Sequence, residues 1–157
     1  MSAKYIDEAI SKIDASGAER PFLQSKLRVD QSQIIDAEKV VGFSFPESFR
    51  YFLYSYGSGD FKGIEFYGLV PGNNDLEEIP NSLWLTMKHR RKQNLPDDLY
   101  IVENLGDGSL ACLLLSQRVK DECPVILWDY SEGRKGRPHV LAGSFGEYFY
   151  QRIIEVL

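Results

Sequence analysis

The sequence predicts one α+β domain over residues 1–157, with a central, largely antiparallel sheet flanked by N- and C-terminal helices. Three observations support this. Both ends of the chain repeat apolar residues at helical spacing, strand-like segments follow one another closely in the second half, and no linker or low-complexity tract divides the chain. A chain of 157 residues can bury one substantial core. Helices grouped around an antiparallel sheet form the α+β class.

Two helices are expected in the first quarter of the chain. Residues 5–15 place isoleucines at helical spacing, and Gly17 follows as a stop. A second helix begins at Asp30, whose side chain can cap it. Gln33, three residues later, can complete a capping box. Gly42 ends this helix after a short apolar stripe.

The segment FSFPESFRYFLYSYGSGDF, residues 43–61, predicts a third helix with its start and stop in the sequence. Pro46 suits the first turn, where a missing N–H costs nothing. Gly57 can adopt the left-handed conformation that closes a helix, and Gly59 allows a further turn. One buried face follows from the helical spacing of Phe49, Phe52, Leu53 and Tyr56.

The middle of the chain predicts a strand, a helix and a group of strands. Residues 63–70 have strand composition, and a helix over 76–93 follows, with Pro80 able to break its first turn. Gly106, Asp107 and Gly108 form a hairpin turn. The strands are expected at 99–104, 110–115 and 125–129, with a short one at 139–141.

The chain closes with a helix that Ser144 caps and Glu147 supports in a capping box. Apolar residues at helical spacing continue along this helix to the end of the chain. We expect one core that contains Phe49, Phe52, Leu53, Trp128, Phe145, Phe149 and Ile153.

Composition excludes several classes of protein. A net charge of −5 and a pI near 5.1 argue against a general nucleic-acid binder. No segment approaches the roughly 20 apolar residues that span a bilayer, and the N-terminus lacks a signal-peptide centre, so we expect a cytoplasmic protein without a membrane partner. Cys112 and Cys123 lie in apolar segments and are expected as free thiols rather than a disulfide. The basic run at 88–92 is expected as a solvated helix face, with an RNA or DNA contact as the alternative.

No motif predicts catalysis. GSGDFKG lacks the ending of a phosphate loop, ENLGDGS lacks the later ligands of a calcium loop, and no GxSxG elbow occurs. Cysteine and histidine spacing fits no zinc site. We therefore expect no catalytic residue, metal or cofactor. A hydrolase that uses His89 or His139 with a nearby acid stays open as an alternative.

Tyrosines among acidic residues favour a protein–protein contact surface. In a strand, Glu65 and Tyr67 would share one face, and acids follow in the next loop and at the helix start. The simpler interpretation is that these acids are solvated and that those at the helix start stabilise the helix dipole. The predicted contact residues are Glu65, Tyr67, Asp75, Glu77 and Glu78, with Asp129 and Glu132 as a second patch.

The order of these motifs resembles the SUKH superfamily, which contains the yeast cell-wall synthesis regulator and many small bacterial proteins. A glycine-ended helix precedes the Pro-started aromatic helix, a GIEFYGL strand, a Gly-Asp-Gly hairpin, CPVILWD and a final Ser-Phe-x-Glu helix. The resemblance covers roughly residues 30–157. The matching residues are Glu38, Gly42, Pro46, Phe52, Leu53, Tyr56, Gly57, Gly59, Gly68, Gly106, Asp107, Gly108, Pro124, Val125, Trp128, Asp129, Ser144, Phe145 and Phe149.

The resemblance to bacterial members implies an immunity protein, or antitoxin, which binds and neutralises a secreted polymorphic toxin, often a nuclease. It also implies a function outside catalysis. A nuclease site is basic because it binds phosphates, so an acidic protein can occupy it with electrostatic steering. The alternative is a regulatory or scaffold interaction module without a toxin partner.

Overall fold

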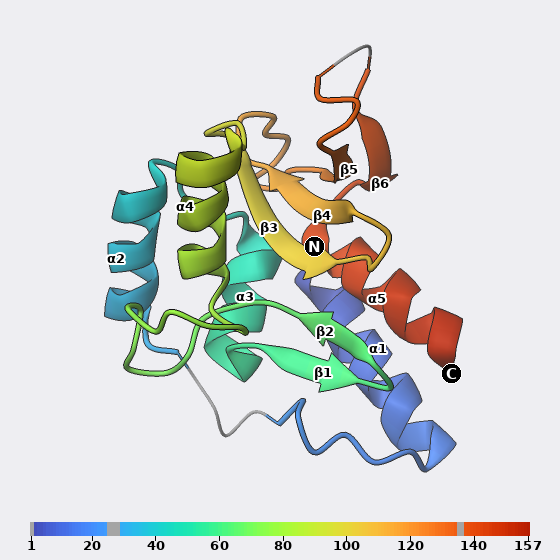
Figure 1. The fold of residues 1–157 in the computed structure, drawn as a ribbon. Coiled ribbons are helices and arrows are strands. Elements are labelled where there is room, and N and C mark those ends of the chain that lie inside the picture. The colour runs from blue at the N-terminus through green and yellow to red at the C-terminus, as the bar shows by residue number, and fades with distance from the viewer. Residues whose placement is uncertain (1, 25–28, 135–136) are drawn as a thin grey trace.

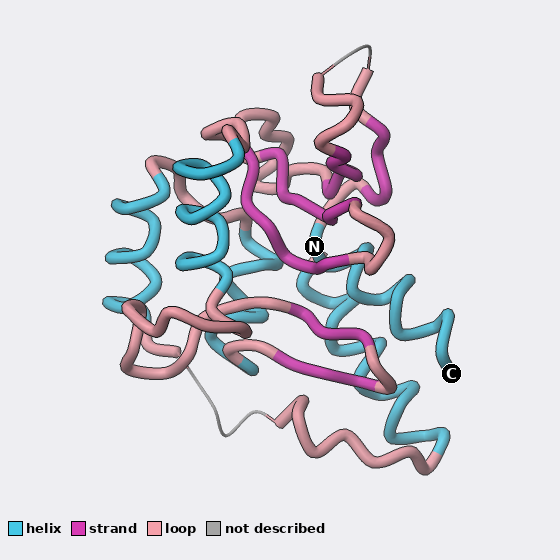
Figure 2. Tube along the Cα trace, in the orientation of Figure 1, coloured by secondary structure: helices cyan, strands magenta, loops and turns pink. Residues whose placement is uncertain are grey.

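The computed structural model of the chain describes residues 2–24, 29–134 and 137–157, and it confirms the α+β class. Helices α1 and α5, at the two ends of the chain, lie beside each other, as Figures 1 and 2 show. Terminal helices around a sheet were expected. The helices are α1 (Ala3–Ser16), α2 (Gln31–Val41), α3 (Glu47–Tyr56), α4 (Ser82–Gln93) and α5 (Phe145–Val156).

Two antiparallel sheets organise the described chain. A small hairpin pairs β1 (Gly59–Phe61) with β2 (Ile64–Phe66). A four-stranded sheet has the order β3-β4-β5-β6, so each strand pairs with the one that precedes it in sequence. Its strands are β3 (Leu99–Asn104), β4 (Ser109–Leu114), β5 (Val125–Asp129) and β6 (His139–Ala142).

The larger sheet separates two hydrophobic clusters. The main cluster joins α1, α2, α3, α5 and the hairpin to one sheet face, and the second cluster lies on the other face beside α4. Strand β4 is buried along its whole length because both of its faces are covered. That burial explains why LACLLL is continuously apolar rather than alternating.

Six of the seven predicted core residues share the main cluster, whereas Trp128 does not. All seven are buried, so the prediction of burial is confirmed and the prediction of a single core is wrong. Side chains alternate across β5, and this alternation places Val125 in the main cluster and Trp128 in the second. Cys112 and Cys123 are both buried and free, as expected.

Most predicted helix ends are confirmed. Asp30 accepts a hydrogen bond from the Gln33 N–H at 3.0 Å, and Ser144 accepts one from the Glu147 N–H at 3.2 Å. Gln33 does not complete a capping box, because its side chain instead donates to Val70 O and the Asn74 side chain. Pro46 is the N-cap residue rather than the first helical residue.

Two elements are shorter than predicted. The strand expected over 63–70 ends at Phe66, and the helix expected over 76–93 begins only at Ser82. Asn81 stops that helix from extending backwards: its side-chain oxygen caps Leu83 N, while its amide donates to Asn74 O and Leu76 O. Residues 71–81 therefore form a loop.

Gly59, Gly68 and Gly146 are required by close approach rather than by a turn. At Gly146, a Cβ would lie 2.1 Å from the Ser2 carbonyl oxygen. Gly59 lies inside β1, and a Cβ there would meet the Leu23 side chain at 2.0 Å. At Gly68, a Cβ would lie 1.8 Å from the carbonyl oxygen of Gly57. The expected turn at Gly59 is thus wrong, because the segment before α2 packs directly against this strand.

Candidate functional site

The hairpin places two carboxylates opposite each other. Asp60 on β1 pairs with Glu65 on β2, and both side chains are half-buried. Burial, and secondarily the charge of Asp60, raises the pKa of Glu65. Within the described ranges, neither carboxylate forms an ion pair. Like charges directly opposite in a hairpin are destabilising, so this pair is retained at a cost in stability.

Tyr67 does not lie beside Glu65 on an exposed surface. The strand ends before Tyr67, whose N–H donates to Val102 O at 2.8 Å, and its ring packs in the second cluster at 4% exposure. Burial, followed by the charges of Glu65 and Glu103, raises the pKa of its phenol. The prediction of an exposed contact tyrosine here is wrong, because the chain leaves the hairpin and enters the core.

Asp75, Glu77 and Glu78 are all exposed on the loop of residues 71–81. They do not mark a helix start, since α4 begins beyond them. The loop is held at Asn74, whose amide donates to Gln33 O at 3.0 Å, and at Asn81. The result is an acidic loop attached to α2 by side-chain hydrogen bonds.

The second predicted patch lies where β5 ends. Asp129 is half-buried and accepts hydrogen bonds from the Ser131 N–H and hydroxyl at 2.8 and 2.7 Å, which lower its pKa. Asp107 lies on the β3–β4 hairpin two residues before Ser109, which pairs with Asp129, and its charge acts to raise the pKa of Asp129. Glu132 is exposed on the following loop. Figure 1 places this end of β5 far from the 71–81 loop, so the structure keeps the predicted patches apart.

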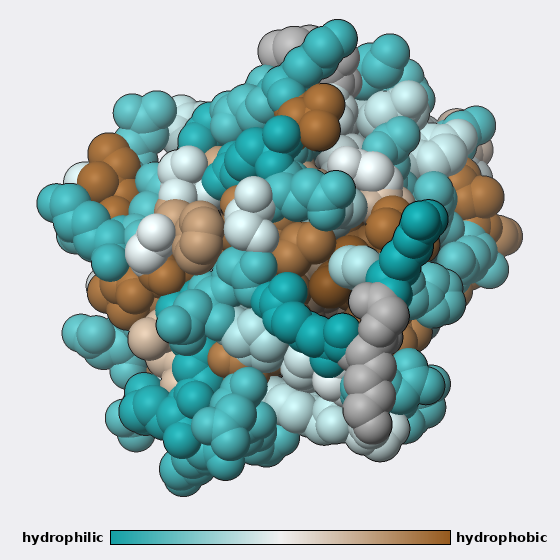
Figure 3. Space-filling model, turned by 90° about the horizontal axis from the view of Figure 1, so that it is seen from above, coloured by the Kyte–Doolittle hydropathy of each residue, from teal (hydrophilic) through white to brown (hydrophobic). Residues whose placement is uncertain are grey.

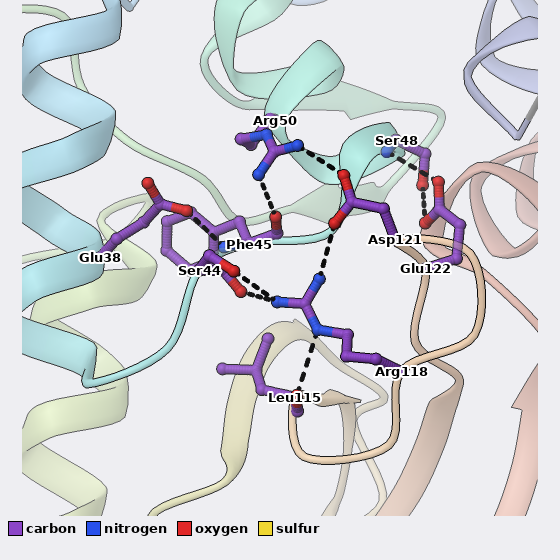
Figure 4. Close-up of polar contacts among 9 residues, drawn as sticks. All are labelled: Glu38, Ser44, Phe45, Ser48, Arg50, Leu115, Arg118, Asp121 and Glu122. Atoms are coloured by element: carbon purple, nitrogen blue, oxygen red, sulfur yellow. Dashed lines mark hydrogen bonds and ion pairs between the residues drawn. The ribbon is translucent and has the colours of Figure 1, made fainter.

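A polar network that the sequence did not predict joins the α2–α3 connection to the β4–β5 connection (Figure 4). Asp121 lies between two arginines, at 2.7 Å from Arg50 and 3.2 Å from Arg118. Arg50 also donates to Phe45 O at 2.8 Å, and Arg118 to Ser44 O. These contacts join segments more than 70 residues apart, which no local motif reveals.

The same connection caps α3. Pro46 offers no side-chain cap, and Glu122 supplies one by accepting the Ser48 N–H at 3.0 Å and the Ser48 hydroxyl at 2.9 Å. The Glu47 N–H donates to Asp121 O at 2.9 Å. Burial raises the pKa of Glu122 despite these hydrogen bonds. The network therefore holds the start of α3 and the α2–α3 connection against the β4–β5 connection.

A groove of about 380 Å³ lies between α2 and α3. Its walls include two exposed residues, Ile35 on α2 and Tyr54 on α3, together with Glu38 and Arg50. On the face seen in Figure 3, hydrophobic residues form several separate areas within a mostly hydrophilic surface. Side chains of this mixture are typical of a protein contact surface.

The basic run at the end of α4 is divided among several contacts. Lys88 lies 4.9 Å from the centre of the Trp84 ring, and the His89 ring bonds the Tyr130 hydroxyl at 2.5 Å. Burial, and secondarily Lys88, lowers the pKa of His89. Arg90 donates to Val41 O at 3.0 Å. Lys88, His89 and Arg90 make contacts within the fold, and the last two residues of the run, Arg91 and Lys92, are exposed.

The described ranges hold no cluster of metal ligands, and burial raises the pKa of both thiols. They contain no group of three or more His, Cys, Asp or Glu side chains that could hold a metal ion. Burial raises the pKa of the Cys123 thiol to about 12, and burial likewise raises that of Cys112. A thiol with a raised pKa is a poor nucleophile. No helix in these ranges is long and apolar enough to cross a bilayer.

Comparison with protein families agrees with the observed architecture. The family model SUKH_5, described as SMI1-KNR4 cell-wall, matches residues 6–154. The match runs from α1 into α5 and so includes both sheets and all five helices named above. A toxin-immunity role and an SMI1/KNR4-like role are both consistent with this match. The chain belongs to the SUKH family.

Proposed function

We propose that this protein is a cytoplasmic immunity protein that neutralises a secreted polymorphic toxin by stoichiometric binding. Family membership over residues 6–154 is the observation that carries the proposal. The whole of residues 1–157 would act as one binding domain. The protein would block its partner by occupying a surface rather than by chemistry.

The acidic loop supports a basic partner, such as a nuclease domain. Asp75, Glu77 and Glu78 are exposed on a loop that hydrogen bonds with Gln33 attach to α2. A loop already held in place loses little conformational entropy on binding. Its charges would attract a phosphate-binding surface over distances near the Debye length of about 10 Å. Glu65, Asp129 and Glu132 are further proposed contacts, with Asp129 and Glu132 in a separate acidic area at the far end of β5.

A second function is favoured by the family description itself. SMI1-KNR4 cell-wall names a branch outside toxin immunity, and a regulatory interaction module without a toxin would use a similar surface. This alternative predicts binding without protection. The α2–α3 groove, with Ile35 and Tyr54 exposed, fits either function.

Co-expression separates these functions. The neighbouring genes are first searched for a toxin with a variable C-terminal domain. That domain is then expressed in a sensitive host, with and without the protein, and colony survival is counted. We expect protection, together with a one-to-one complex in size-exclusion chromatography. Survival no better than with an unrelated acidic protein of similar size would overturn the immunity proposal.

A further inference from the structure

The outer face of helix α4 carries one aromatic and three basic side chains. Lys88, Arg91 and Lys92 follow Trp84 by four, seven and eight residues, so the four share one side of the helix. Trp84 and Lys88 are half-buried, with the Lys88 Nζ 4.9 Å from the centre of the Trp84 ring, whereas Arg91 and Lys92 are exposed. Helix α4 thus presents an aromatic ring and a group of positive charges to solvent.

The other sides of α4 are held by the fold. The Thr86 hydroxyl accepts the Ile101 N–H of β3 at 3.1 Å, and Arg90 donates to Val41 O at the end of α2 at 3.0 Å. These contacts fix the rotation of the helix about its axis. The direction of the outer face is therefore set before any partner binds.

The three bases of this face have no acidic partner within residues 2–24, 29–134 and 137–157. Five arginines elsewhere do form ion pairs: Arg20, Arg50, Arg118, Arg134 and Arg152. The charges of Asp97 and Asp98, which follow the helix, act on Arg90, and Arg90 lies on another side of α4. Lys88, Arg91 and Lys92 therefore remain available to a partner.

Acidic side chains lie at the other end of the same surface. The loop of residues 71–81 leads directly into α4 and lies at its N-terminal end (Figure 1). Its acids Asp75, Glu77 and Glu78 are exposed, and no described residue forms an ion pair with them. The order along the surface is thus acids, then Trp84, then bases.

We propose that this surface pairs with the same surface of a second copy of the chain, about a two-fold axis near Trp84. In a two-fold contact, each residue of one protomer meets in its partner the residue that its own counterpart meets in return. The loop acids of each protomer then lie against the α4 bases of the other, three against three. The net charge of −5 does not prevent this, because charges farther apart than the Debye length of about 8–10 Å are largely screened.

Nucleic acid fits this surface less well than a second copy does. The three bases would attract a phosphate backbone, and the acids of the adjoining loop would repel it. Charge complementarity therefore selects an occupant that carries both signs, as this chain does.

The dimer is expected to be weak. Exposed ion pairs contribute little individually, and one loop with one helix face supplies fewer residues than the roughly 20–30 per side of a standard interface. The loop is also the proposed contact for a basic partner. Binding of such a partner would therefore release the second copy.

Sedimentation equilibrium of the purified protein over a range of concentrations tests the proposal. We expect dimers of the wild-type protein at low salt. Two variants reverse one end of the surface each: Asp75→Lys/Glu77→Lys/Glu78→Lys and Lys88→Glu/Arg91→Glu/Lys92→Glu. Each should weaken dimerisation by about tenfold or more, because like charges then meet in the contact. An equal mixture of the two should form heterodimers, since every reversed group meets its opposite.

A matched variant separates this pairing from the effect of net charge. Glu8→Lys/Glu19→Lys/Asp36→Lys changes the net charge as the reversed loop does, at exposed acids outside the surface. It should dimerise like the wild-type protein. Mixed with the variant reversed on α4, it should form fewer heterodimers than the loop variant does. Equal recovery with both would show that net charge alone drives association, and would overturn the proposal.

The remaining outcomes are equally decisive. A wild-type protein that stays monomeric at its highest soluble concentration overturns the proposal, and so do dimers that neither reversal weakens. Weakening by both reversals without recovery in their mixture shows that the acids and bases do not meet, and overturns it too. If a monomeric protein binds a labelled oligonucleotide and reversal of α4 abolishes this binding, the face belongs to nucleic acid instead. No measurement here requires a toxin, so the result is independent of the immunity function.

Discussion

Glu122 caps helix α3 from the β4–β5 connection, where its carboxylate accepts both the N–H and the hydroxyl of Ser48, 74 residues earlier in the chain. The Ser48 hydroxyl in turn accepts the Gly146 N–H at 3.0 Å. One short chain of hydrogen bonds thus joins the start of α3, the β4–β5 connection and the start of α5.

The Glu122 cap makes stability depend on pH in a defined direction. Burial raises the pKa of Glu122 above its ordinary 4.5, so the folded state binds this proton more tightly than the unfolded state. We therefore compare the free energy of unfolding of the wild-type protein with that of the Glu122→Gln variant. The difference, wild type minus variant, should increase as the pH falls from neutral through the raised pKa of Glu122. The increase should stop below about 4.5, where both states are protonated. Urea unfolding across this range, with Glu132→Gln as the exposed control, measures the difference, and an opposite slope would contradict the prediction.

The aromatic core should tolerate truncation poorly. Phe52 is fully buried. The centre of its ring lies 5.1 Å from the centre of the Phe145 ring and 5.6 Å from the centre of the Phe149 ring. Phe52→Ala should lower the free energy of unfolding by about 3–5 kcal/mol, through lost burial and the cavity left behind. Phe22→Ala, at a residue that is 63% exposed, is the control. A cost near that of the control would show that the core is packed differently.

Reversing one charge in the hairpin should stabilise the protein. Glu65→Lys replaces a repulsion across from Asp60 with an attraction, with an expected gain of about 0.2–1 kcal/mol. The double variant Asp60→Lys/Glu65→Lys restores a like-charge pair and should lose this gain. Thermal unfolding at low and high salt provides the measurement. A gain that salt does not reduce would point to a cause other than charge.

The acidic loop should control the rate of association. Asp75→Lys/Glu77→Lys/Glu78→Lys should slow binding to the cognate toxin domain and flatten its salt dependence, with little effect on folding, because all three side chains are exposed. Reversing the exposed acids Glu8, Glu19 and Asp36 makes the same change in net charge elsewhere. Stopped-flow association at low and moderate salt compares the two triple variants. Equal behaviour would remove the loop as a contact surface and leave the immunity proposal standing.

Neither histidine should be needed for protection. His89 is occupied by its hydrogen bond to Tyr130, and His139 begins the exposed strand β6. His89→Ala and His139→Ala should therefore support host survival as well as the wild-type protein does. Circular dichroism and toxin binding verify that each variant is intact. Lost protection in a folded, toxin-binding variant would revive the hydrolase alternative.

The sequence by itself determined the local features of this fold. Asp30, Gly42 and Ser144 act within one helical turn of the ends that they set, so their roles depend only on neighbouring residues. The Gly-Asp-Gly hairpin and the continuous apolar run of β4 are local in the same sense. Such features reflect backbone geometry and periodicity, and a single sequence contains both.

Tertiary structure decided which residues contact each other and which remain exposed. Gln33 bonds the 71–81 loop instead of its own helix end, and Tyr67 enters the second cluster rather than the surface. Trp128 belongs to a different cluster from Phe52, and Glu122 reaches Ser48 only after the chain has folded. Each of these contacts joins residues distant in sequence, and its energy depends on packing and on hydrogen bonds in buried surroundings. Local propensity carries no information about such partners, and so the acids could be identified from the sequence while their separation into distant patches could not.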